Sequence, residues 1–289
     1  MSNVIKKLPP NKFPKLLSEI NDPPDELFLI GEMPPDDHIF LAVVGSRKFT
    51  SYGKQAAEQI ISRLKGFPIV IVSGLAIGID SIAHNAALNV GLTTIAIPGS
   101  GLNDDVLYPA SNRSLAKKIV ERGGALLSPF KPDFKATQWS FPARNRIMAG
   151  ISQAVLIIEA EEKSGTLITA RLALDYNRDV YAIPGSIFSP TSRGTNSLIG
   201  DGAMLVTKSE DILNALGFRI DDTTKKSQDS PPTDMSPEEK AVWKLLSSPL
   251  ERDSLLRLMD MPVSKANGIL SLMEIKEFIK EADGKIFRG

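Results

Sequence analysis

The sequence predicts an α/β protein. Its main domain is an extended Rossmann-like fold with a doubly wound, mostly parallel sheet, and a small C-terminal winged-helix-like domain follows. Short runs of β-branched and other apolar residues recur along the chain, and helical patterns separate most of them. Strands that are apolar along their whole length are typical of a parallel sheet covered by helices on both faces. The predicted strands are residues 39–44, 69–73, 93–97, 125–128, 154–159, 179–183 and 203–206. The predicted helices include residues 52–65, 79–89, 112–120 and 166–177.

The first 38 residues contain several prolines and one short helical pattern, at residues 13–20. We therefore expect residues 1–38 to form an N-terminal arm, the remnant of a small helical domain. The main domain is expected to occupy residues 39–218.

The end of the chain is predicted to form a separate small domain. Residues 219–236 are polar, contain prolines and lack periodicity, which indicates a linker. Ser236 followed by Pro237 has the form of a helix start. Residues 237–289 then contain three helical patterns and a hairpin with an Asp-Gly turn, which is typical of a winged-helix-like domain. A helical cap with a frayed tail is the alternative.

The composition narrows the class of function. Lys+Arg and Asp+Glu both total 34, so any binding of DNA must depend on a local cluster of charge. The chain has no cysteine and only two histidines, so we expect no metal site and no cofactor. Neither an apolar leader nor an apolar run of membrane length is found. We therefore expect a cytoplasmic protein without membrane contact.

Glycine-bearing loops follow several predicted strands, at the edge where ligands of a parallel sheet bind. Gly45, Ser46 and Arg47 follow the first strand of the main domain, and Gly74 follows the next one. Glycine lets the backbone approach a phosphate, free N–H groups bind its oxygens, and arginine adds a bidentate cation. Each of these loops is also compatible with a purely structural turn.

A second group of candidates combines basic and apolar side chains. Arg144, Asn145, Arg146 and Ile147 lie in the segment WSFPARNRI at residues 139–147. This interleaving suits a phosphate backbone with a base packed beside it, although a charged helix start would have a similar composition.

A further candidate loop lies between a predicted strand and a predicted helix and consists of Lys163, Ser164, Gly165 and Thr166. These residues can present N–H and hydroxyl groups to an anion at the helix N-terminus. The chain contains no G-x-x-x-x-G-K-[ST] pattern, which weighs against hydrolysis of nucleoside triphosphates.

Taken together, the motifs resemble the DNA-processing protein A family (DprA/Smf). The similarity runs in unbroken order from about residue 39 to residue 216. It is carried by VVGSR (43–47), SGLAIGID (73–80), IPGSGL with YPASN (97–112), FPARNRIMAGIS (141–152), EAEEKSGTLITARLALDYNRDVYAIPGS (159–186) and SRGTNSLIGDGA (192–203).

The resemblance implies a homodimer that binds single-stranded DNA in a positive pocket, without ATP or metal and without being an enzyme. It also implies loading of a RecA-type recombinase onto incoming strands in natural transformation. Arg47 would hold a phosphate, and Ile147 would contact a base. The expected DNA-binding residues are Gly45, Ser46, Arg47, Gly74, Arg144, Asn145, Arg146, Ile147, Lys163, Ser164, Gly165 and Thr166.

The chain departs from this family at both ends. Many relatives carry a full helical N-terminal domain of the sterile-alpha-motif type, of which at most the final segment is expected here. The helical pattern at residues 263–275 has few basic residues beyond Lys265. It therefore favours contact with protein over binding of duplex DNA.

Two other functions stay open on sequence grounds: a Rossmann-like nucleotide-binding sensor and a nucleotide N-glycoside hydrolase. The hydrolase would need a carboxylate facing the sugar, for which Glu159, Glu161 and Asp80 are the candidates. Asp80 in a first helical turn is more often a cap, and His84 one turn later is expected to be a packed helix residue. The hydrolase signature, with a double glycine and a glutamate on the next helix, is missing.

Overall fold

The computed structural model describes residues 4–35, 37–218, 234–246, 248–282 and 284–288. Its contacts divide the chain into two compact units, Met1–Arg219 and Ile220–Gly289. Most of the predicted linker at residues 219–236 lies outside the described residues.

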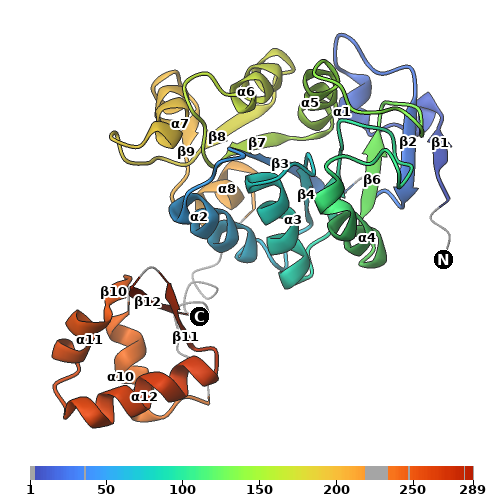
Figure 1. The fold of residues 1–289 in the computed structure, drawn as a ribbon. Helices are drawn as coiled ribbons and strands as arrows, with labels where there is room; N and C mark the ends of the chain where they lie inside the picture. Colours follow the sequence, from blue (N-terminus) through green and yellow to red (C-terminus); the bar gives the residue numbers. More distant parts are fainter. Residues whose placement is uncertain (1–3, 36, 219–233, 247, 283, 289) are drawn as a thin grey trace. The chain divides into compact units, whose positions relative to one another are not determined.

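The first unit is built on a nine-stranded sheet with the order β1-β2-β6-β5-β4-β3-β7-β8-β9 (Figure 1). From β6 to β9 in this order all neighbouring strands are parallel, whereas β1 and β2 are antiparallel. The predicted α/β class with a mostly parallel sheet is confirmed. The strands are β1 (Lys6–Leu8), β2 (Leu27–Gly31), β3 (Ile39–Val44), β4 (Ile69–Ser73), β5 (Thr94–Ala96), β6 (Ala125–Ser128), β7 (Ala154–Ile157), β8 (Asp179–Ala182) and β9 (Met204–Leu205).

The order of the strands reverses between β3 and β7. From β3 the chain moves outward through β4, β5 and β6, then returns to pair β7 with the other side of β3, with Val44 opposite Ile157. The connections that leave these two strands diverge to opposite faces of the sheet. Such a switch point leaves a crevice at the carboxyl ends of the strands, where ligands of open α/β sheets bind.

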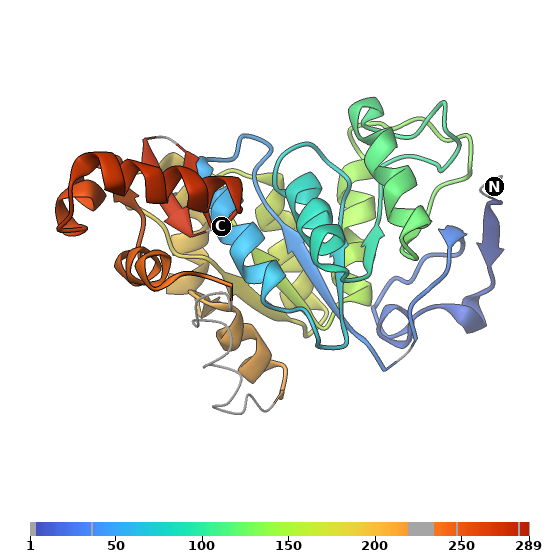
Figure 2. The ribbon, with the colours of Figure 1, turned by 90° about the horizontal axis from the view of Figure 1, so that it is seen from below.

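Helices cover both faces of this sheet (Figure 1). Figure 2 shows α2, α3 and α4 in front of the strands. On that face lie α2 (Ser51–Ser62), α3 (Ile79–Val90), α4 (Arg113–Glu121) and α8 (Ser209–Ala215). On the other face lie α1 (Lys15–Ser18), α5 (Ser140–Ile151), α6 (Gly165–Asp175) and α7 (Pro190–Gly200). Short 3₁₀ turns are formed by Pro10–Lys12 and Ala110–Asn112.

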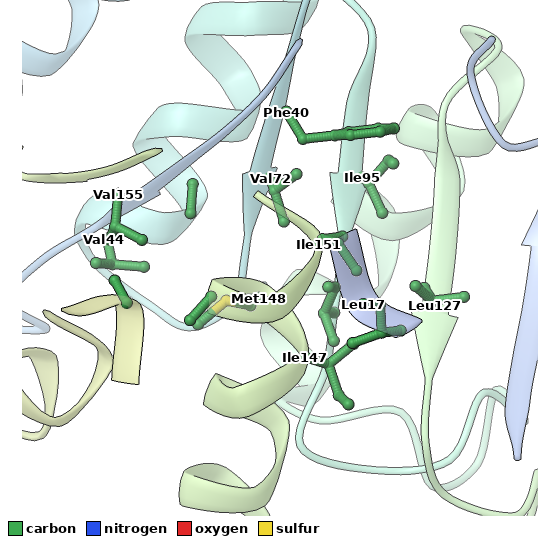
Figure 3. Close-up of a cluster of buried hydrophobic side chains, with 14 of the residues drawn as sticks. Leu17, Phe40, Val44, Val72, Ile95, Leu127, Ile147, Met148, Ile151 and Val155 are labelled. Atoms are coloured by element: carbon green, nitrogen blue, oxygen red, sulfur yellow. The ribbon is translucent and has the colours of Figure 1, made fainter. Parts of the chain in front are cut away.

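The described part of residues 1–38 differs from the expected arm, because β1 and β2 extend the main sheet. The apolar run of β2 pairs with β6 and is almost fully buried. In the same segment Leu17 of α1 is fully buried and packs against α5, close to Ile147 and Ile151 (Figure 3). The prolines of this segment occupy the connections, so they do not prevent its strands from joining the sheet.

The second unit contains the three predicted helices and a small antiparallel sheet of order β10-β12-β11. Helix, strand, two helices and a hairpin follow one another, which is a winged-helix-like order. Its core includes Trp243, Leu255 and Leu270. Ser236 and Glu239 form a capping box at the first helix. The elements are α10 (Pro237–Leu245), β10 (Leu250–Glu251), α11 (Arg252–Leu258), α12 (Val263–Ile275), β11 (Ile279–Ala282) and β12 (Lys285–Arg288).

Among the described residues, none of the helices has the length and apolar character needed to cross a membrane.

Replacement of Leu17 by alanine tests whether the N-terminal segment belongs to the core. Leu17 is 0% exposed, and its loss should lower the free energy of unfolding by about 2–5 kcal/mol. Urea unfolding of the full chain, followed by circular dichroism, measures the change. The control Leu174→Ala removes a side chain that is 59% exposed and should change stability by less than about 0.5 kcal/mol. Equal stabilities for the two variants would show that residues 1–38 are a dispensable arm.

Candidate nucleic-acid interface

A pocket of about 350 Å³ lies at the switch point of the sheet. It is bordered by the loop after β3, the start of α3, one side of α5 and the N-terminus of α6. These elements bring together predicted site residues that are more than 100 positions apart in the chain. The predicted residues that line the pocket are Gly45, Ser46, Arg47, Arg144, Asn145, Ser164, Gly165 and Thr166.

The loop after β3 presents Arg47 to solvent. At Gly45 a Cβ atom would lie 2.8 Å from the side chain of Ile79, so the glycine allows the loop to pack on the start of α3. The Ile79 N–H then donates to the carbonyl oxygen of Ser46 at 3.2 Å. Arg47 is exposed, and its guanidinium carbon lies 5.2 Å from the centre of the Phe141 ring, a cation–π distance. The loop thus offers a cation that is held over an aromatic ring.

Arg144 forms the floor of the pocket. Its side chain is only 4% exposed, and its Nη1 atom donates to the carbonyl oxygen of Ile97. A Cβ atom on Gly74 would lie 1.8 Å from that Nη1 atom and 2.5 Å from Oδ2 of Asp80. Gly74 does not line the pocket, but its missing side chain gives Arg144 the room to reach across the sheet edge.

The charges of Asp80 and Arg144 depend on each other. Burial raises the pKa of Asp80, while the charge of Arg144 and backbone hydrogen bonds from Ala76 and Gly74 oppose this rise. Burial also lowers the pKa of Arg144 to about 10, an effect that Asp80 opposes and Arg47 reinforces. Arg144 therefore remains a cation at neutral pH, and its positive charge lies directly beneath the pocket.

The N-terminus of α6 forms the opposite wall. Ser164 is its N-cap, and its hydroxyl accepts the N–H of Thr166 at 3.1 Å. The first amides of a helix point outward and carry partial positive charge, which favours an anion at this end. Lys163 is exposed just before the cap but does not line the pocket.

Two predicted residues on α5 lie outside this pocket, and the predicted base contact of Ile147 is corrected by the structure. Ile147 is 2% exposed and packs beside Leu17 in the core, so it has no free surface for a base (Figure 3). Arg146 forms an ion pair with Asp22 at 2.7 Å and lines a different groove. Residues two apart on a helix point about 200° apart, so Arg146 cannot share the side of Arg144.

The pocket also contains residues that were not predicted as site residues. Phe141 and Met148 line it together with Arg144 and Asn145. The spacing of three and four residues from Arg144 places them on one side of α5, and this periodicity was the signal that could have identified them. Lys48, next to Arg47, adds a further exposed cation.

The three candidate carboxylates have different surroundings. Glu159 is 1% exposed and does not line the pocket. It accepts hydrogen bonds from the N–H of Thr50 at 2.9 Å, the hydroxyl of Thr50 at 2.5 Å and the hydroxyl of Thr191 at 3.1 Å. Asp80 accepts the N–H of Gly74 at 3.1 Å. Only Glu161 is both exposed and at the pocket.

His84 lies fully buried on α3, one turn after Asp80, as expected for a packed helix residue. Its Nδ1 atom is 2.7 Å from the hydroxyl oxygen of Thr94. Burial, reinforced by the charge of Arg144, lowers the pKa of His84 to about 3. The imidazole is therefore neutral at physiological pH.

Comparison with known proteins finds one family, in the family match and in the individual relatives alike. The family described as "DNA recombination-mediator protein A" matches residues 7–217. "Protein Smf" of Escherichia coli (strain K12) is 44% identical over 208 residues, which cover 72% of this chain and 55% of the relative. "DNA processing protein DprA" of Streptococcus pneumoniae (strain R6) is 44% identical over 206 residues, 71% of this chain and 72% of the relative. The chain thus spans little more than half the length of the Escherichia coli relative.

Two solved structures are similar to the first unit. The X-ray structure of DprA from Streptococcus pneumoniae matches with a TM-score of 0.68 and 41% identity, over 75% of each chain. A structure of DprA from Helicobacter pylori matches with a TM-score of 0.66 and 33% identity, over 73% of this chain and 95% of that one. The latter is described as giving insight into a "unique single-stranded DNA binding mode" of that protein.

The depressed pKa of His84 predicts a contribution to acid sensitivity. Between pH 6.5 and about pH 3 this imidazole is protonated in the unfolded chain but not in the folded one. The free energy of unfolding should therefore fall as the pH is lowered, by about 1.4 kcal/mol per pH unit from this group. His84→Gln should reduce that slope, measured by urea unfolding between about pH 6 and pH 5, where most carboxylates stay ionised.

The matched control is Thr94→Val, which removes the hydroxyl next to His84 but keeps the imidazole. It should lower stability at every pH and leave the slope unchanged. A steep slope that persists in His84→Gln would contradict the assignment.

Proposed function

The chain belongs to the DNA recombination-mediator protein A family, and we propose that it binds single-stranded DNA in the pocket between β3 and β7. The observation that carries this proposal is the position of Arg47, exposed over Phe141 at the rim of the pocket. An unpaired strand offers its phosphates to the guanidinium and its bases to nearby apolar surface. In duplex DNA the bases are paired and stacked inside the helix, so they are not available for this contact.

The electrostatics of the pocket suit a polyanion although the whole chain has no net charge. Arg47 and Lys48 are exposed at the rim, the cation of Arg144 lies beneath, and the first residues of α6 line the pocket. Glu161 is the exposed acid that lines the pocket with them. The field at a site depends on such local groups and much less on the total charge.

We further propose that the protein works by binding and not by catalysis. Of the three carboxylates that the hydrolase alternative offers, Glu159, Glu161 and Asp80, Glu159 is the one that follows β7. Its oxygens are occupied by Thr50 and Thr191, so it is engaged in holding loops together. Residues with this role are poor candidates for attack on a sugar, because a base must face its substrate.

The expected partners follow from the family. A recombination mediator acts on DNA together with a recombinase, so we propose that a RecA-type recombinase is loaded onto the strand that this protein binds, in the cytoplasm, during natural transformation. The family resemblance also supports a homodimer.

Replacement of Arg47 by alanine should weaken binding of oligo-dT roughly 10- to 100-fold, because a charge-assisted contact to phosphate is lost. Fluorescence anisotropy across a salt series measures both the affinity and its salt dependence. Removal of one phosphate contact should reduce the salt slope by about 0.7 for a single strand. Duplex DNA and a mononucleotide should bind far more weakly than oligo-dT.

Lys65→Ala is the matched control. Lys65 is an exposed cation between α2 and β4, just before the amino end of β4, whereas the pocket lies at the carboxyl ends of the strands. It should leave binding unchanged. Tight binding of a mononucleotide, with no preference for the oligomer, would favour the sensor instead. Equal effects of the two substitutions would contradict the assignment of the pocket.

A further inference from the structure

We propose that a second groove, on the other side of α5, is a base-stacking subsite that continues the path of the single strand, with Trp139 as its stacking surface. This inference rests on the proposed function of the first pocket. The groove measures about 1030 Å³ and lies between residues 22–26, residues 129–135 and α5. It is distinct from the first pocket, since the two share no lining residue.

Three aromatic rings form one wall of this groove. Phe130 and Phe134 are stacked, with ring centres 4.6 Å apart and planes inclined by 19°. Trp139 contacts both in edge-to-face geometry, with centres 5.7 Å and 5.3 Å away. Phe130 is 8% exposed, so the cluster is anchored in the protein on one side.

The indole of Trp139 is held in place but remains accessible. Neither phenyl ring lies parallel to it, and 60% of its surface is exposed. Aromatic side chains fixed in this way lose little conformational entropy when a flat ligand stacks on them. A base of an unpaired strand is such a ligand, because every base offers a π face.

The charges of the groove favour bases over phosphates. Asp22 is paired with Arg146 at 2.7 Å, and Glu26 is paired with Lys7. Among the remaining lining residues, Lys131 and Lys135 are balanced by Asp25 and Asp133. With no net charge left over, binding here should depend on stacking and only weakly on salt.

The two sites adjoin along the chain at the first turn of α5. Trp139 precedes the helix and borders the groove, whereas Phe141 borders the first pocket beside Arg47. Only Ser140 separates them, and it is fully buried with its hydroxyl donating to the Gly99 carbonyl at 2.6 Å. A strand that leaves the first pocket past Phe141 therefore reaches the indole within one turn of helix.

The test uses the full chain and the intrinsic fluorescence of Trp139. The protein contains two tryptophans, and the other, Trp243, is 8% exposed in the core of the second unit. Oligo-dT should therefore quench an emission that disappears in Trp139→Phe. Trp139→Ala should weaken oligo-dT binding roughly 5- to 100-fold with an unchanged salt slope, and Trp139→Phe should retain most of the affinity.

Arg47→Ala distinguishes failure of this inference from failure of the proposed function. One outcome is that oligo-dT binding depends on Arg47, that Trp139→Ala keeps the affinity of the original chain, and that oligo-dT leaves the tryptophan emission of the original chain unchanged. In that case the groove is not a DNA subsite. That result would leave the groove to another occupant such as a peptide. If oligo-dT does not bind the original chain at all, the proposed function itself fails.

Discussion

The buried guanidinium of Arg144 is the feature on which the candidate site depends. It comes from α5 on one face of the sheet, donates to the end of the β5 strand region at Ile97, and lies over Gly74 close to Asp80 of α3 on the other face. A buried charge is costly unless hydrogen bonds and opposite charges compensate it. Asp80 and the Ile97 carbonyl provide this compensation, so the same group connects both helical layers and gives the pocket a positive floor.

A second buried acidic side chain positions the neighbouring segments. Glu159, at the end of β7, accepts hydrogen bonds from Thr50 after β3 and from Thr191 after β8. At Gly53 a Cβ atom would lie 2.2 Å from its carboxylate, so the first turn of α2 fits closely around it. The strand tips are thus positioned by buried polar contacts, while the exposed cations at the rim remain free of this structural role. Such a division suits a rigid binding surface.

Helix α5 separates the first pocket from the second groove. Its Arg144 and Asn145 side borders the first pocket, Arg146 borders the second groove, and Ile147 is packed in the core next to that groove. Four adjacent residues in one basic motif therefore have three different environments. A motif of this kind is better interpreted as a helix with several faces than as a single cationic patch.

The sequence alone determined the α/β class, the parallel strands between residues 39 and 206, the small C-terminal domain and the family. These follow from local apolar periodicity and from motifs in fixed order, which need no knowledge of distant contacts. It also identified the loops at Arg47 and Ser164, because glycine and capping residues after a strand have a local physical meaning. Only the tertiary structure decided that β2 joins β6, that Ile147 and Arg146 leave the pocket, and that Glu159 is engaged by threonines. Each of these depends on which partner a side chain meets across the fold, and that information is not contained in any short stretch of sequence.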